Sequence, residues 1–170
     1  MNTILKFSIV VAVLGVSACT DPGRFGNDAG SVTQGANGAF GSDIASDPTS
    51  VAYFQQTVGD RVLFAVDQST LTQDGQFTLQ GQAAWLNANP EYTAVIEGHA
   101  DEQGTTEYNI ALGARRADEA RSFLISQGVS GSRLKVVSFG KERPLEICSD
   151  ETCYAKNRRA VTVLATGLTS

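Results

Sequence analysis

Hydrophobic positions between residues 60 and 166 alternate between strand-like runs and helix-like stripes. Short runs of apolar and β-branched residues are typical of strands, whereas apolar residues that recur every three or four positions are typical of helices. The chain thus predicts strands at 61–66, 93–97, 134–139 and 160–165, helices at 72–87 and 105–127, and a helical turn at 154–158. The order β-α-β-α-β-(α)-β predicts an α/β (α+β) two-layer sandwich with a mixed four-stranded sheet.

Local signals mark the ends of the two long helices. Thr72 suits the N-cap of the first, because its hydroxyl can accept a hydrogen bond from a free amide of the first turn. Pro90 lies just beyond its end, and the residue before a proline avoids the α region. The second helix opens with Thr105 and Thr106, and Gly128 suits its C-cap.

The first 50 residues differ in composition from the rest. Residues 1–18 contain one lysine and the apolar run 7–16, which is too short to span a bilayer and has the layout of a secretory leader. Residues 19–50 are rich in Gly, Ser, Asn and Asp, which predicts a flexible tether. The expected organisation is a leader at 1–18, a tether at 19–50 and one folded domain at 51–170.

The leader ends in Val16-Ser17-Ala18-Cys19, which resembles a lipobox, the site where a bacterial lipoprotein is cleaved and its cysteine lipidated. The alternative is an ordinary cleavage site next to a chance cysteine. Each buried methylene of an acyl chain such as palmitate contributes about 0.8 kcal/mol, so several chains on Cys19 hold firmly. Because Thr20 rather than an aspartate follows Cys19, the sorting rule of enteric bacteria implies the periplasmic face of the outer membrane.

The overall charge narrows the classes of function. The net charge is −5, and no cluster of Lys and Arg interleaves with aromatic residues, so no nucleic-acid partner is expected. The sequence contains neither a phosphate-binding glycine loop nor a nucleophile elbow, and we expect no cofactor. A hydrophobic content of 42% suits a single domain with appendages.

Two further cysteines, Cys148 and Cys153, lie five positions apart. In an exported chain a structural disulfide is more common than two reactive thiols, because the compartment is oxidising. A metal site is the alternative, but it needs four ligands, and only His99 and scattered carboxylates could complete it.

The turn after the second predicted strand concentrates polar side chains, and three kinds of site compete for it. With Glu97, the carboxylates Asp101 and Glu102 could serve glycoside hydrolysis, but no apolar pocket that would keep one of them protonated is evident. As a metal site, His99, Asp101 and Glu102 provide too few ligands. His99 by itself is more often a structural residue whose ring hydrogen-bonds the backbone.

A binding site suits the turn better. A ligand side chain that ends in an ammonium and a carboxylate needs an anion and a cation a few ångströms apart. Asp101 would bind the ammonium, and Arg116 would bind the carboxylate through its two-pronged guanidinium. Arg116 lies about 15 Å along the helix from Thr106, so the turn must fold back toward it.

Two strings, EGHADEQGTTEYNIALGARRA at 97–117 and YAKNRRAV at 154–161, resemble the OmpA-like C-terminal domain family. The resemblance covers about residues 60–166 and implies the same sandwich, with its helices on one face of the sheet. It also implies a ligand, the diaminopimelate of peptidoglycan stem peptides. The residues expected to bind it are Asp101, which matches the family's acidic residue, the motif residues Asn109, Leu112 and Arg116, and in addition His99 and Arg158.

Together with the lipobox, the resemblance is to lipid-anchored members of that family. It implies a non-enzymatic protein that joins the outer membrane to peptidoglycan and supports envelope integrity and cell division. It also implies partners in the Tol system, TolB first. Two alternatives stay open, a wall-binding lipoprotein outside the Tol system and a cell-wall hydrolase.

Overall fold

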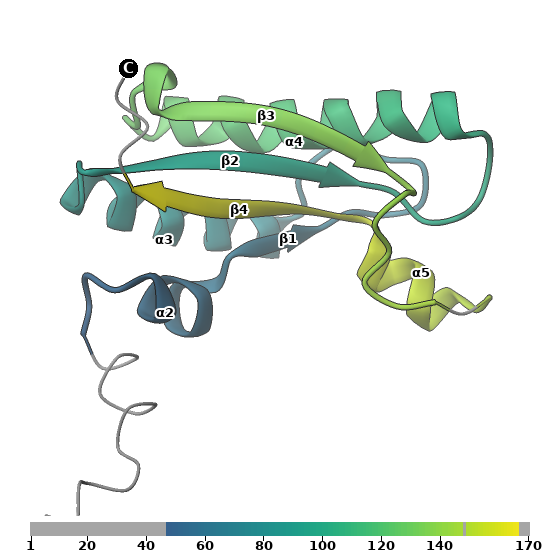
Figure 1. Ribbon diagram of the computed structural model, residues 1–170, viewed down its shortest axis with the longest axis horizontal. Coiled ribbons are helices and arrows are strands. Elements are labelled where there is room, and N and C mark those ends of the chain that lie inside the picture. The colour runs from purple at the N-terminus through teal and green to yellow at the C-terminus, as the bar shows by residue number, and fades with distance from the viewer. Residues whose placement is uncertain (1–46, 148, 167–170) are drawn as a thin grey trace, which may run out of the picture. The chain divides into compact units, whose positions relative to one another are not determined.

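The computed structural model describes residues 47–147 and 149–166 (Figure 1). The predicted leader, the lipidation site Cys19, nearly all of the predicted tether and Cys148 lie outside the described residues. Among the residues that are described, no helix is both long and apolar enough to cross a membrane.

Four strands form one sheet in the order β1-β4-β2-β3. They are β1 (Arg61–Leu63), β2 (Tyr92–His99), β3 (Leu134–Gly140) and β4 (Arg159–Thr166). β2 and β3 run parallel, whereas β4 runs antiparallel to both β1 and β2. The predicted mixed four-stranded sheet is thus confirmed, and β1 and β3 are its edges.

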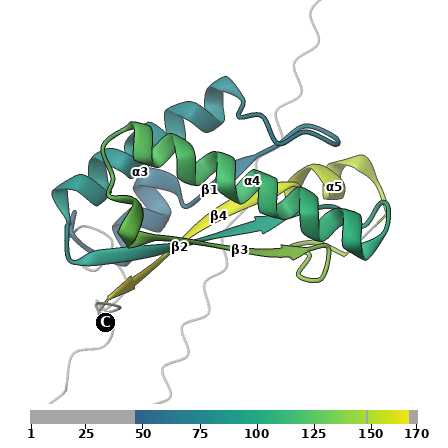
Figure 2. The same ribbon diagram turned by 90° about the horizontal axis from the view of Figure 1, so that it is seen from above.

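The long helices α3 (Gln73–Ala88) and α4 (Thr106–Ser126) cover the same face of the sheet (Figure 2). This arrangement confirms the predicted two-layer sandwich. The core lies between the two layers, where apolar residues of both helices meet the inward side chains of the strands. Its largest members include Phe54, Leu79, Trp85, Leu86, Ile96 and Leu124.

The helix ends follow the predicted signals. Thr72 and Thr105 are the N-caps, and their hydroxyls accept hydrogen bonds from the amides of Gly75 and Tyr108. Gly128 adopts a φ of 94° just beyond the end of α4, a conformation that favours glycine. The shorter helix α5 (Glu151–Asn157) begins three residues before the predicted helical turn.

The first strand is shorter than predicted. β1 ends at Leu63 rather than at residue 66. The amide of Phe64 still donates to the carbonyl of Arg158, the residue directly before β4. The chain then leaves the sheet, and Asp67 takes a φ of 57°, which is uncommon for a residue other than glycine. The loop after β1 therefore turns toward α4 instead of extending the sheet.

A short helical segment precedes β1 and was not expected as an element. It comprises α2 (Val51–Tyr53) and the π-helix η1 (Phe54–Gly59); a further 3₁₀ turn, η2 (Gly131–Arg133), precedes β3. Phe54 is fully buried, and its ring lies 4.9 Å from that of Trp85. The indole Nε1 of Trp85 donates to the carbonyl of Pro48, so contacts with the domain already begin before residue 51.

Two glycines set the spacing between α4 and the sheet. A Cβ on Gly98 of β2 would lie 1.8 Å from the carbonyl oxygen of Gly113 on α4, and a Cβ on Gly113 would lie 2.4 Å from the hydroxyl of Ser138. Backbone therefore packs directly on backbone at this point. The contact holds the first half of α4 close to the end of β2, where the polar turn begins.

Candidate functional site

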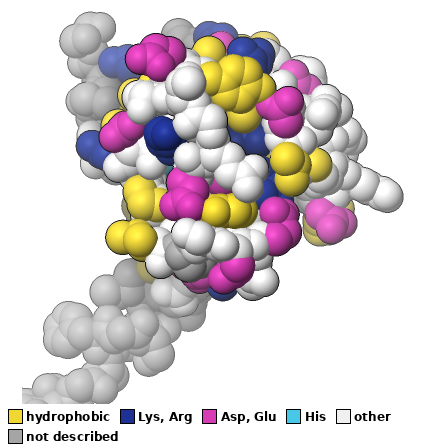
Figure 3. Space-filling view, turned by 90° about the vertical axis from the view of Figure 1, so that its right-hand side faces the viewer, with side chains coloured by type: hydrophobic (Ala, Val, Ile, Leu, Met, Phe, Trp, Pro, Cys, Tyr) yellow, Lys and Arg dark blue, Asp and Glu magenta, His cyan; other side chains and the backbone are white. Residues whose placement is uncertain are grey.

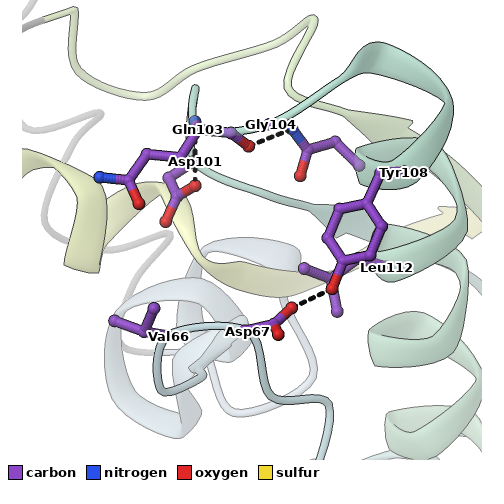
Figure 4. A pocket seen from close by; sticks show the side chains of 8 residues that line it. Val66, Asp67, Asp101, Gln103, Gly104, Tyr108 and Leu112 are labelled. Carbon is purple, nitrogen blue, oxygen red and sulfur yellow. Dashed lines mark hydrogen bonds between the residues drawn. The ribbon is translucent and has the colours of Figure 1, made fainter.

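A hollow of about 250 Å³ lies where the turn after β2, the start of α4 and the loop after β1 meet (Figure 4). Figure 3 looks at this end of the domain and shows acidic and hydrophobic side chains next to one another on it. Such a volume suits one ligand side chain rather than a large molecule. The hollow is lined by Val66, Asp67, Asp101, Gln103, Gly104, Tyr108, Asn109 and Leu112.

Asp101 contributes a largely buried carboxylate to this hollow. One of its oxygens accepts a hydrogen bond from the amide of Gln103 at 3.2 Å, which holds the turn in shape. The other oxygen accepts from the guanidinium of Arg158, also at 3.2 Å. The anion that the sequence predicts is therefore present and has a cationic partner.

The turn itself is held from both sides. The side-chain amide of Asn109 donates to the carbonyl of Gln103 at 2.7 Å, and Nζ of Lys141 donates to the carbonyl of Gly104 at the same distance. Gly104 has a φ of 85°, which favours glycine. These contacts fix the loop on rigid elements, as a preformed binding site requires.

Arg116 lies behind the wall of the hollow rather than in it. Its side chain is 0% exposed, and its guanidinium donates to the carbonyls of Gln68, His99 and Ala65 at 2.8, 2.8 and 3.2 Å. Burial lowers the pKa of Arg116 to about 10, an effect that Asp101 opposes, so the group stays charged at neutral pH. Arg116 thus ties the loop after β1 to the end of β2.

This position differs from the one expected from sequence. A two-pronged bond from Arg116 to a ligand carboxylate requires exposed N–H groups, and in this structure three of its five N–H groups already bind backbone carbonyls. The turn does fold back over Arg116, as the spacing along the helix requires. A role for Arg116 in ligand binding stays a prediction.

Arg158 connects the site to α5. Its side chain is buried and contacts two carboxylates, Asp101 at 3.2 Å and Glu151 on α5. Its Nε also donates to the carbonyl of Phe64 at 3.2 Å. Arg158 therefore supports Asp101 from beneath rather than lining the hollow.

The outer wall of the hollow comes from residues that the sequence did not single out as ligand contacts. Tyr108 extends from the first turn of α4, and its hydroxyl donates to the carboxylate of Asp67 across the mouth of the hollow (Figure 4). This bond raises the pKa of Tyr108. Val66 is exposed beside Asp67. The pair brings a second carboxylate within the same small space as Asp101.

His99 points away from the hollow. Its side chain is 2% exposed, and its ring stacks on Phe139 with centroids 5.6 Å apart. Neither ring nitrogen has a hydrogen-bond partner among the described residues, although Nε2 lies 3.5 Å from a carboxylate oxygen of Glu97. The expectation that its ring bonds the backbone was wrong, because the ring packs against an aromatic face. The backbone carbonyl of His99, by contrast, accepts from Arg116.

The environment of His99 predicts acid sensitivity. Burial, reinforced by Arg159 and Arg143, lowers its pKa from 6.5 to about 4. Below pH 6.5 the unfolded chain gains a proton that the folded chain takes up only near pH 4, so the free energy of unfolding should fall across this window by up to about 3 kcal/mol. Urea unfolding at pH 7.0, 5.5 and 4.5 measures the loss, and His99→Phe should reduce it. An equal loss in the variant would contradict the assignment.

Of the six residues predicted to bind the ligand, the structure places Asp101, Asn109 and Leu112 in the hollow. Arg116 and Arg158 lie directly behind it, and His99 lies on the other side of β2. Tyr108 carried one available signal, since it is an aromatic residue in the opening turn of a helix that follows the polar turn. Asp67 carried a weaker signal, since it begins a polar turn after the first predicted strand and matches an acidic position of the family, but its φ of 57° is not predictable from that pattern.

Cys153 is disulfide-bonded, as predicted for it, whereas its expected partner Cys148 lies outside the described residues. The bond lies near the site, because α5 carries both Cys153 and Glu151. No group of three or more His, Cys, Asp or Glu side chains among the described residues is placed to hold a metal ion.

Comparison with known proteins agrees with the fold. The sequence profile of the OmpA family matches residues 63–158. The C-terminal domain of Helicobacter pylori MotB superimposes with a TM-score of 0.59 at 21% identity, covering 64% of this chain and 86% of that one; this likeness concerns the fold alone. Fold and profile together define an OmpA-like domain.

Closer relatives narrow this class. A peptidoglycan-associated lipoprotein from Mesorhizobium japonicum is 49% identical over 92% of this chain and 89% of its own length. The crystal structure of the peptidoglycan-associated lipoprotein from Burkholderia pseudomallei superimposes with a TM-score of 0.64 at 36% identity, covering 72% of this chain and 100% of that one. The chain therefore belongs to the OmpA family, among its peptidoglycan-associated lipoproteins.

Proposed function

We propose that the hollow at the end of β2 binds the diaminopimelate side chain of peptidoglycan stem peptides, non-covalently and without turnover. The observation that carries this proposal is the buried carboxylate of Asp101 in a preformed hollow of side-chain size. The proposal agrees with the name shared by the relatives and with the match of Asp101, Asn109, Leu112 and Arg116 to the family motif.

The charges around the hollow fit a zwitterionic side chain. Asp67 and Asp101 together offer acceptors for an ammonium group. Arg116 and Arg158 place two positive charges behind the wall, which favours a carboxylate nearby. A stem peptide with lysine in place of diaminopimelate presents a side chain that ends in an ammonium alone, would leave that positive potential unused and should bind more weakly.

Arg158 explains how Asp101 stays available. In the free protein Arg158 pairs with both Asp101 and Glu151, so the buried carboxylate is neutralised. When a ligand ammonium binds Asp101, Arg158 keeps its partner on α5 and its bond to the Phe64 carbonyl. Asp101 is then paired with the ligand ammonium and Arg158 with Glu151. A buried charge without a counter-charge would oppose binding, and this arrangement avoids it.

This binding would join two layers of the cell envelope. A lipidated Cys19 would hold the protein in the outer membrane, and a tether of about 30 residues would span an r.m.s. distance of roughly 30 Å. Within that reach the domain could search the wall beside the membrane. We infer that the protein links the outer membrane to peptidoglycan from the periplasmic side.

Replacing Cys19 by serine tests the anchor. The variant should move from the membrane fraction to the soluble periplasmic fraction, because an unlipidated chain lacks the acyl chains that provide firm attachment. Fractionation of cells followed by immunoblotting measures this, with Cys153→Ser as a control that keeps Cys19. Continued membrane retention of the Cys19→Ser protein would mean that another feature anchors it.

We further propose that the protein works within the Tol system, with TolB as a protein partner. The support is the resemblance of the two sequence strings and the lipobox to the lipid-anchored branch of the family. A pull-down of purified TolB by the Cys19→Ser chain tests this. Wall binding without TolB capture would favour a lipoprotein outside that system, and release of soluble muropeptides from sacculi would favour a hydrolase.

A further inference from the structure

A second hollow, of about 510 Å³, lies along the outer edge of β1. It shares no lining residue with the hollow at the end of β2, and nothing in the proposed function uses it. Its floor and walls come from β1 and its continuation on one side and from the first turns of α3 on the other. The lining residues are Arg61, Val62, Leu63, Phe64, Ala65, Thr72, Asp74, Gly75 and Thr78.

The backbone of β1 leaves one side of this hollow without a strand partner. Thr162 donates to the carbonyl of Asp60, and Phe64 donates to the carbonyl of Arg158, so residues 60 and 64 face β4. Directions alternate along an antiparallel strand, and Arg61 and Leu63 must therefore face outward. Within residues 47–147 and 149–166, their two N–H and two C=O groups have no strand partner, and Figure 1 shows β1 at the edge of the sheet.

The edge has two of the usual protections, a length of three residues and the charged side chain of Arg61. It has no proline, and no strand among the described residues covers it. Here Leu63 is 47% exposed on the edge strand, and Phe77 is 77% exposed on α3. Phe77 follows Asp74 by three positions, so the two are neighbours on the helix surface beside the hollow.

The charged side chains around this hollow indicate which charge a segment that binds there should carry. The carboxylate of Asp74 is exposed in the first turn of α3 and makes no ion pair with the described residues, whereas Arg61 is already paired with Asp60 at 2.8 Å. The uncompensated charge of the hollow is therefore negative. The tether sequence does not match it, because residues 20–46 contain Asp21, Asp28 and Asp43 but only one basic residue, Arg24.

We propose that the outer edge of β1 docks an extended, basic segment of a partner protein, which adds to the sheet as a fifth strand beside α3. The segment's backbone bonds Arg61 and Leu63, and its side chains alternate in direction. Those on the face away from α3 cover Leu63, whereas those beside α3 reach Phe77 and include a lysine or arginine that pairs with Asp74. Strand addition of this kind takes its affinity from backbone bonds and its selectivity from side-chain pockets.

The test uses the full mature chain carrying Cys19→Ser and an acetylated, amidated hexapeptide of alternating lysine and valine as probe. Saturating peptide should slow amide hydrogen exchange at Arg61 and Leu63 about tenfold or more, while amides of the β3 edge stay unchanged. The same peptide with every backbone amide methylated should not bind. Asp74→Asn should weaken binding about 2- to 5-fold, and Asp118→Asn, on the exposed face of α4, should not.

Three results would overturn the proposal. Unchanged exchange at Arg61 and Leu63 would mean that the edge does not accept a strand. Equal binding of the methylated peptide would mean that charge alone attracts the probe. Slow exchange at these amides without peptide, together with a dimer in sedimentation velocity, would assign the edge to a second copy of the chain.

Discussion

Replacing Asp101 by asparagine should weaken binding to peptidoglycan by roughly 10- to 100-fold, because a charge-assisted hydrogen bond contributes about 1.5 to 3 kcal/mol. Asparagine keeps the size of the side chain and can still accept from the amide of Gln103. Arg158 retains its partner Glu151, so the fold should survive. The predicted effect is therefore on affinity and not on stability, which calorimetric titration with a diaminopimelate muropeptide and urea unfolding measure separately.

Asp118→Asn is the matched control for this prediction. It changes the net charge of the protein by the same amount as Asp101→Asn. Asp118, however, lies on the exposed side of α4, away from the hollow. It should bind the muropeptide as the parent chain does. If both variants lost affinity equally, the loss would reflect overall charge, and Asp101 would have no specific role.

Replacing Arg116 by methionine should destabilise the domain by roughly 3 kcal/mol or more. The substitution leaves the carbonyls of Ala65, Gln68 and His99 without their buried donor, and each such group costs about 1 to 3 kcal/mol. Removal of a buried charge offsets part of this loss. Urea unfolding measures it, and ligand binding should fall as well, because the loop after β1 carries Asp67.

Arg121→Met provides the comparison for Arg116. Arg121 lies on the same helix and also donates to backbone carbonyls, those of Leu134 and Gly131, but it is only partly buried. Its replacement should cost less stability and should leave ligand affinity unchanged. Equal losses of stability and affinity in the two variants would mean that Arg116 has no special role in holding the loop after β1.

Much of the fold follows from periodicity and caps. The strands and long helices are predictable because their apolar residues recur at fixed spacing and because threonines such as Thr72 and Thr105 mark helix starts. The segment α2–η1 is not, since a nine-residue stretch that buries mainly Phe54 has no period. β1 is overestimated because its apolar run continues into a loop that the left-handed Asp67 turns away from the sheet.

A site residue is predictable from the sequence only where its type of side chain and its position next to a predicted element both indicate binding. Asp101 lies at the beginning of a polar turn directly after a strand, which is where a binding carboxylate is expected. The burial of Arg116 depends on three carbonyls, two from the loop after β1 and one from the end of β2, that point at one guanidinium, and no local pattern encodes that convergence. The contact between Tyr108 and Asp67 has the same origin, because the two residues are 41 positions apart.

Co-sedimentation of the soluble Cys19→Ser chain with purified sacculi tests the central claim most directly. The protein should pellet with sacculi, a soluble muropeptide that contains diaminopimelate should release it, and the same muropeptide with lysine in place of diaminopimelate should not at equal concentration. Asp101→Asn should stay largely in the supernatant, whereas Asp118→Asn should pellet like the parent chain. Failure of the parent chain to pellet, or release by the lysine muropeptide as readily as by the diaminopimelate muropeptide, would contradict recognition of a zwitterionic stem-peptide side chain by this hollow.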